Sequence, residues 1–134
     1  ISLKFANQAV GSFLLSDRTP SPWTWEMALG ESVKFPKTGM NAIRFLGTEG
    51  ALEFPNLVLW RHAEGNGNWH HEIGPEVIDA PFIDAYVAQC AHLRAVTRGL
   101  ETPIIDALNG SRSLDATLAA ARAATSGTRI KLSM

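Results

Sequence analysis

The sequence predicts an α+β fold: an open-faced, predominantly antiparallel sheet of about six strands, with two C-terminal helices on one face. Short apolar runs separated by Gly, Pro and Asn fill the first half, which is typical of strands and turns. The second half changes to the period of amphipathic helices. Strands joined by short turns pair antiparallel, and helices collected at the end of a chain cover one face. With 134 residues, 46% of them hydrophobic, residues 1–134 fit a single domain.

The expected strands are short and lie between turn residues. They span residues 1–5, 8–16, 41–46, 51–54, 57–62 and 68–73. Residues 24–29 could extend as a further strand, and residues 128–132 are expected to return as one. Because the chain begins inside the first strand, it looks like a piece of a longer protein.

Two amphipathic segments follow. Residues 82–98 place an apolar stripe on one side of a helix, and Gly99 is a natural helix end. Residues 110–125 predict a second helix, with Asn109 as its N-cap. The alanine-rich composition of this helix permits close packing on a sheet.

Several strands are apolar on both sides, which a sheet with one wet face should not be. Residues 13–15 and 57–60 are consecutive apolar runs. A large apolar surface usually has a partner. We therefore expect a homodimer, which could pair again to a tetramer, through the open sheet face.

Composition disfavours several classes of function. The net charge is −1 with no basic block, so nucleic acid is not expected as a partner. No apolar run approaches the ~20 residues that a membrane helix needs. Cys90 is the only cysteine, which excludes an internal disulfide and suits a reducing cytoplasm. His62 could meet His70 or His71 across a hairpin, but no third ligand is evident, so a metal site is not expected.

The most informative segment is residues 16–26, SDRTPSPWTWE. Trp23 and Trp25 lie near the carboxylates of Asp17 and Glu26, on a backbone stiffened by two prolines. Rigid loops with aromatic rings often wall binding sites, and these four residues are candidates to bind a small-molecule substrate. The alternative is that the tryptophans fill the end of the sheet core.

A polar pair lies at the edge of the apolar stripe of the first helix. Gln89 and His92 are three residues apart and therefore neighbours on the helix surface. Buried polar groups need partners, and bonding to backbone carbonyls is the favoured explanation for both side chains. Contact with a substrate is the alternative.

The order and spacing of these segments resemble the C-terminal domain of the glucose–fructose oxidoreductase and inositol dehydrogenase (Gfo/Idh/MocA) family. The resemblance covers essentially the whole chain. It rests on LLSD at 14–17, SPWTWE at 21–26, GTEGALEFPNLVLWR at 47–61, DAYVAQCAHLRAVTRGLETPI at 84–104 and NGSRSLDATLAAARAATSGTRIKL at 109–132. Relatives more often show Asp-Gly-Leu where this chain has Asn109-Gly110-Ser111.

The resemblance implies a two-domain enzyme that moves a hydride between a sugar or cyclic polyol and NAD or NADP. A Rossmann domain, absent from this chain, would bind the cofactor, while this domain would supply the substrate wall and an oligomerisation sheet. No catalytic residue of the family maps onto the chain, and its glycine clusters lack the dinucleotide-binding spacing. The alternatives are a non-catalytic homologue that acts as a binding or assembly module, and an unrelated stand-alone enzyme.

Overall fold

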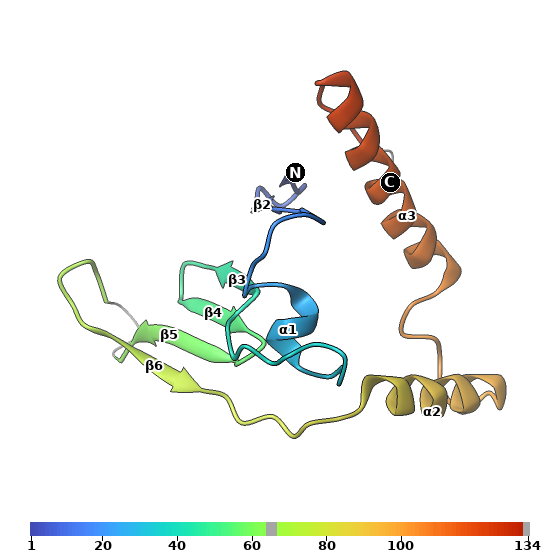
Figure 1. Ribbon diagram of the computed structural model, residues 1–134, viewed down its shortest axis with the longest axis horizontal. Helices are drawn as coiled ribbons and strands as arrows, with labels where there is room; N and C mark the ends of the chain where they lie inside the picture. The colour runs from blue at the N-terminus through green and yellow to red at the C-terminus, as the bar shows by residue number, and fades with distance from the viewer. Residues whose placement is uncertain (64–66, 133–134) are drawn as a thin grey trace. The chain divides into compact units, whose positions relative to one another are not determined.

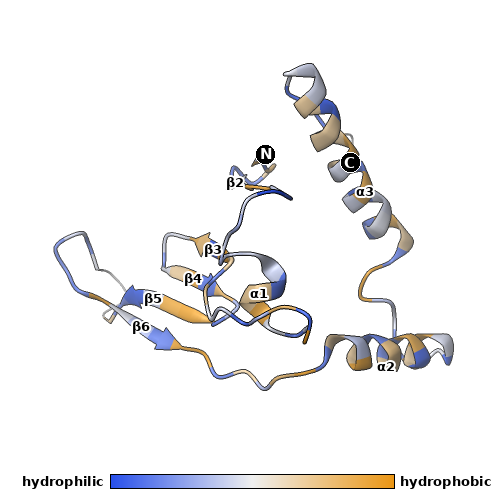
Figure 2. Cartoon of the chain, viewed as in Figure 1, coloured by the Kyte–Doolittle hydropathy of each residue, from blue (hydrophilic) through white to orange (hydrophobic). Residues whose placement is uncertain are grey.

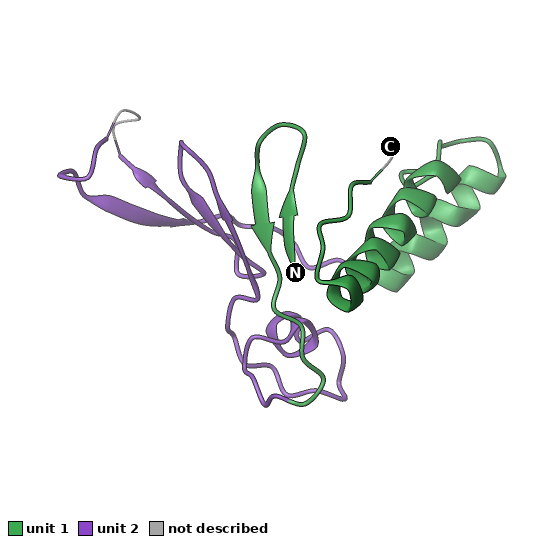
Figure 3. Ribbon diagram, turned by 90° about the horizontal axis from the view of Figure 1, so that it is seen from above, with its two compact units in different colours: residues 1–18, 85–134 green, residues 19–84 purple. Residues whose placement is uncertain are grey.

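The computed structural model describes residues 1–63 and 67–132 (Figure 1). Its elements combine antiparallel strands with helices, which confirms the predicted α+β class. The chain divides into two compact units (Figure 3). Unit 1 consists of Ile1–Arg18 and Ala85–Met134, and unit 2 consists of Thr19–Asp84. Each unit is described by itself.

Unit 2 contains a four-stranded antiparallel sheet whose strands follow chain order. The strands are β3 (Ile43–Leu46), β4 (Ala51–Phe54), β5 (Val58–His62) and β6 (Ile73–Val77). Short connections join β3 to β4 and β4 to β5, as the sequence predicted from its Gly and Pro residues. At the first turn Gly50 is required, because a Cβ atom there would lie 2.6 Å from the carbonyl oxygen of Trp60.

The register of this sheet places apolar side chains on both faces. Residues directly opposite one another in neighbouring strands share a face, and alternate residues of one strand share it too. The Trp60 face carries Arg44, Leu46, Ala51, Glu53, Val58, Trp60, His62, Ile73, Pro75 and Val77. The Phe54 face carries Ile43, Phe45, Leu52, Phe54, Leu59, Arg61, Gly74 and Glu76. The strands therefore lack the alternation of apolar and polar residues that is typical of a sheet with one face exposed to water.

Residues 24–29, which the sequence allowed as a strand, form a short helix instead. Helix α1 spans Trp25–Leu29 and ends at Gly30, whose φ of 67° is left-handed. The amide of Gly30 donates to the carbonyl of Glu26, which closes the last turn. Glu, Met, Ala and Leu are all good helix formers, and their propensity outweighs the apolar pattern that suggested a strand.

Strand β6 lies further along the chain than the expected strand at 68–73. The carbonyl and side-chain oxygens of Asn68 accept the amides of His71 and His70, at 2.9 Å each, so this part of the segment is a turn. The amide of Ile78 donates to the carbonyl of Leu57. In an antiparallel pair, backbone hydrogen bonds to the neighbouring strand form at every second residue counted from that pair. Pro75 falls at a position whose nitrogen points away from β5. A proline is tolerated there because β6 is an edge strand.

Unit 1 begins with a two-stranded hairpin. Strands β1 (Ser2–Lys4) and β2 (Val10–Ser12) pair antiparallel, and the amide of Phe5 donates to the carbonyl of Ala9 across the turn. Strand β2 is much shorter than the expected 8–16. In the described part of the chain, six strands are therefore present as sheets of two and four, where the sequence suggested a single sheet.

The two predicted C-terminal helices are present. Helix α2 spans Ala85–Thr97, and Gly99 follows with a φ of 70°, as its expected end. Helix α3 spans Ala107–Ser126. Its N-cap is Asp106, whose carboxylate accepts the amide of Asn109 at 2.7 Å, so the prediction of Asn109 as the cap was wrong by one turn. Residues 128–132 do not form the strand that the sequence predicted.

Few side chains of the described residues are buried. Ala28 on α1 and Ala119 on α3 are the buried apolar residues there. Figure 2 shows hydrophobic residues along much of β5, and large apolar side chains elsewhere in the sheet stay open to solvent. Leu46 is 81% exposed and Val77 is 72% exposed, both on the Trp60 face.

Candidate functional site

Trp25 is held against the sheet by an aromatic contact. Its ring stacks on that of Phe54, with the ring centroids 5.5 Å apart and the planes 20° from parallel. Trp25 opens helix α1, while Phe54 ends β4 on the Phe54 face. The stack covers one side of the indole, yet 48% of Trp25 remains exposed. An exposed, immobilised aromatic ring is a surface on which the apolar face of a flat ligand can lie.

Hydrogen bonds fix the backbone around this ring. Thr38 donates its hydroxyl to the carbonyl of Pro22 at 2.8 Å and its amide to the carbonyl of Met27 at 2.9 Å. Asn56, which follows β4, donates its side-chain amide to the carbonyl of Gly39 at 2.8 Å. The segment 21–26 is therefore tied to residues 38–39, and through them to the end of β4. We call residues 21–26 the aromatic segment.

The structure places three of the predicted site residues on the aromatic segment. Trp23 is 58% exposed and lies two residues before Trp25. Glu26 follows Trp25 directly, and its side chain is exposed. Neither tryptophan is a buried plug of the sheet core, although the stack on Phe54 gives Trp25 a structural role. Asp17 belongs to unit 1 and is exposed there.

His92 makes two contacts that fix its ring. Its Nδ1 atom lies 2.6 Å from Oε2 of Glu101, and its Nε2 atom accepts the backbone amide of Ile104 at 3.2 Å. Because Nε2 accepts a hydrogen bond, the proton of the neutral ring belongs on Nδ1, which donates to the carboxylate. Both nitrogens are therefore used within unit 1. The sequence predicted bonding of His92 to backbone carbonyls, whereas the observed partners are a carboxylate and an amide.

Gln89 lies one turn before His92 on α2, and its side chain is exposed. The contacts of His92 bind the segment after α2 back onto the helix. A shallow hollow at this point is lined by His92, Gly99, Leu100, Glu101, Thr102 and Ile104. Since both ring nitrogens of His92 already have partners, the hollow offers a ligand no free imidazole atom.

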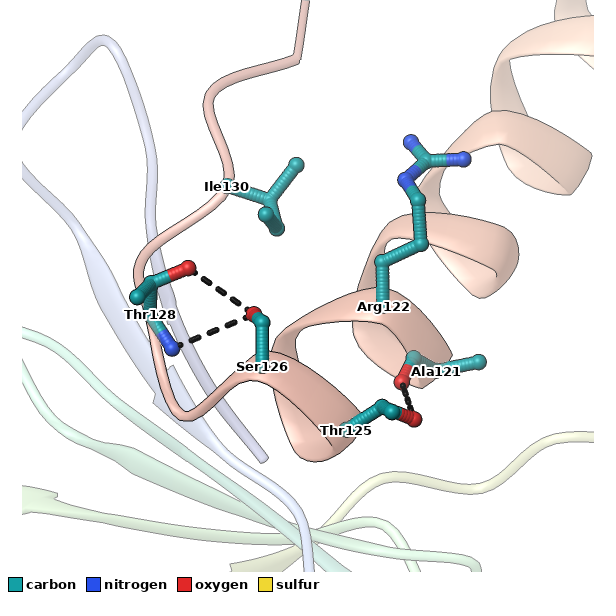
Figure 4. Close-up of a pocket in the computed structure, with 6 residues that line it drawn as sticks. All are labelled: Ala121, Arg122, Thr125, Ser126, Thr128 and Ile130. Carbon is teal, nitrogen blue, oxygen red and sulfur yellow. Dashed lines mark hydrogen bonds between the residues drawn. The ribbon is translucent and has the colours of Figure 1, made fainter.

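A second hollow lies at the C-terminal end of α3 (Figure 4). It is lined by Ala121, Arg122, Thr125, Ser126, Thr128 and Ile130. Thr125 donates its hydroxyl to the carbonyl of Ala121 at 3.1 Å, and the hydroxyls of Ser126 and Thr128 lie 2.8 Å apart. The guanidinium of Arg122 is 3.6 Å from the carboxylate of Asp115. Each of these polar side chains thus has a partner within unit 1.

Sequence reasoning missed a polar cluster around Glu53 on the Trp60 face. Arg44, directly opposite on β3, places its Nε atom 2.9 Å from Oε1 of Glu53. Asn41 donates to Oε2 at 3.1 Å, and Trp60 on the same face also favours the ionised carboxylate. The Arg44 hydrogen bond is the largest influence on Glu53 and, with the smaller bonds and charge, lowers its pKa despite partial desolvation. Spacing alone could not reveal this cluster, because it depends on the register.

Two histidines meet on the β5–β6 hairpin, as the sequence suggested. The rings of His62 and His71 lie edge to face, with centroids 6.4 Å apart. Nδ1 of His71 accepts the amide of Asn68, so the proton of its neutral ring lies on Nε2. Nε2 of His71 then has no lone pair for a metal ion. In the described ranges no three His, Cys, Asp or Glu side chains form a group that could hold one.

The glycine cluster at Gly47 and Gly50 does not form a dinucleotide-binding turn. Gly47 and Gly50 belong to the turn between β3 and β4, where the amide of Gly47 donates to the carbonyl of Gly50 at 2.9 Å. A pyrophosphate site requires a glycine-rich turn that leads from a strand into a helix. Residues 65–66 of the second cluster lie outside the described residues. The described residues do not fit NAD or NADP, and we derive no step through either cofactor.

Comparison with protein-family models, with curated proteins and with solved structures finds no match to this chain. Among the described helices, none has the length and apolar character needed to cross a membrane.

Proposed function

We propose that this chain is the C-terminal domain of an NAD(P)-dependent oxidoreductase that acts on a sugar or cyclic polyol. In that enzyme it shapes the substrate pocket and mediates oligomerisation, while a Rossmann domain outside this chain binds the cofactor. The proposal starts from the resemblance of the whole sequence to the Gfo/Idh/MocA family. A reducing cytoplasm is the compartment that suits its single cysteine.

The observation that carries the proposal is the half-exposed indole of Trp25, stacked on Phe54. Sugars and cyclic polyols present a C–H face that packs on an aromatic ring and hydroxyls that bond to carboxylates. Glu26, the next residue of the helix, supplies an exposed carboxylate. Because Thr38 holds the backbone of the aromatic segment, the ring is positioned before any ligand arrives.

Substrate positioning is the role proposed for this domain, with Trp23, Trp25 and Glu26 as the wall. Asp17, Gln89 and His92 are the other candidates, and they belong to unit 1. The contacts of His92 with Glu101 and Ile104 favour a structural role for that residue.

Assembly is the second part of the proposal, and it rests on the Trp60 face. Leu46, Ile73 and Val77 are 81%, 56% and 72% exposed there. Each buried Å² of apolar surface contributes about 25 cal/mol, so covering such a face is strongly favoured. A second copy of the chain, packed face to face about a twofold axis, would cover it and form a homodimer that could pair again to a tetramer.

The intact gene product provides the experiment that tests this function. If the proposal holds, the sequence before Ile1 encodes a glycine-rich βαβ unit and a Lys-Pro pair, followed by a helix with Asp and His. The purified product should then reduce NAD or NADP in the presence of a sugar or cyclic polyol. A product that contains these residues but oxidises none of a broad panel of such compounds would favour the non-catalytic binding or assembly module.

A further inference from the structure

We draw no further inference here: the strongest candidate, the outer edge that β3 presents in the four-stranded sheet, with the exposed side chains of Phe45 and Leu46 on its two opposite faces, is a strand edge, and nothing in the described residues shows what covers it.

Discussion

The imidazole of His92 bridges two points of the segment that follows α2: the carboxylate of Glu101, at 2.6 Å, and the amide of Ile104, at 3.2 Å. One side chain thereby holds the turn after the helix against the helix itself. The side chain of His92 is 25% exposed, so its bonds are only partly screened by water.

Replacing His92 is expected to reduce stability and to leave chemistry unchanged. His92→Ala removes the partner of the Ile104 amide and of the Glu101 carboxylate, and because both residues are exposed to water the loss costs roughly 0.5–1 kcal/mol in the free energy of unfolding. Urea denaturation of the intact protein measures this loss. The control is Gln89→Ala, one turn earlier and exposed, which should change stability by less than about 0.5 kcal/mol. A His92→Ala protein of normal stability whose turnover collapses would show instead that this residue meets the substrate.

Removing the indole of Trp25 is expected to weaken catalysis in the intact enzyme. Trp25→Ala deletes the proposed stacking surface and should lower kcat/KM by about tenfold, which corresponds to ~1.4 kcal/mol. Trp23→Ala should act in the same direction if its ring also meets the substrate. The measurement is steady-state kinetics beside a melting curve for each variant.

Trp69 offers a matched control for these variants, because it lies in the same unit and is fully exposed, at 101%. Trp69→Ala should alter neither kinetics nor melting temperature. If Trp23→Ala and Trp25→Ala lower only the melting temperature, the tryptophans contribute to the stability of the fold and the aromatic segment is not a substrate wall.

The lowered pKa of Glu53 predicts a pH dependence of stability. The ordinary pKa is 4.5, and hydrogen bonding to Arg44 holds the folded value below it. The ionised carboxylate therefore stabilises the fold fully above about pH 4.5, and this contribution is lost as the pH falls through the folded value. Glu53→Gln should remove that part of the acid dependence, as measured by denaturant unfolding at pH 7 and at successively lower pH.

Glu49→Gln is the control for the acid experiment, since it removes a carboxylate from the neighbouring turn, where Thr48 is its hydrogen-bond partner. Its free energy of unfolding at pH 7 should stay within about 0.5 kcal/mol of that of the unchanged protein. An unaltered pH profile for Glu53→Gln would mean that the Arg44 contact contributes nothing in solution, as is common for exposed ion pairs.

The proposed assembly can be tested with two adjacent residues of β3 that occupy opposite faces. The 14.5 kDa chain should be at least a dimer at about tens of micromolar by light scattering. Leu46→Glu places a charge on the Trp60 face and should yield a monomer. Phe45→Glu, on the Phe54 face, should leave the dimer intact. A monodisperse monomer for the unchanged chain, or a monomer only with Phe45→Glu, would contradict the proposed interface.

The isolated chain is expected to bind neither NAD nor NADP. The reason is that the turn at Gly47–Gly50 connects two strands and offers no helix N-terminus to a pyrophosphate. Isothermal titration calorimetry with each cofactor checks this expectation. Micromolar affinity for either one would overturn the assignment of cofactor binding to another domain.

The sequence predicted the α+β class and most of the sheet, because alternation and turn residues are local signals. It placed β4 at 51–54 and the end of α2 at Gly99 correctly. It failed where local signals compete: residues 25–29 are apolar enough for a strand but consist of helix formers. It also failed at residues 68–73, which were expected to be a strand. Hydrogen bonds to Asn68 form a turn there instead, and β6 lies further along the chain.

The candidate site, too, could be predicted only where it depends on residues close together in the sequence. The aromatic segment was evident from composition, since two tryptophans and two prolines lie within a few residues. The Glu53 cluster was not, because Arg44 and Glu53 meet only through the register of β3 with β4. The partners of His92 were also hidden, since a histidine can bond equally well to a carbonyl, a carboxylate or an amide.

Because of Pro75, the two edges of the four-stranded sheet differ in their ability to pair with a further strand. Its nitrogen, which points outward from β6, carries no hydrogen, so a strand arriving at that edge would miss a bond in the middle of the ladder. Polymerisation through sheet edges requires that both edge strands of each molecule can form backbone hydrogen bonds with a neighbouring molecule. A chain with a proline at the centre of one edge strand is therefore a poor unit for fibril growth, however apolar its faces are.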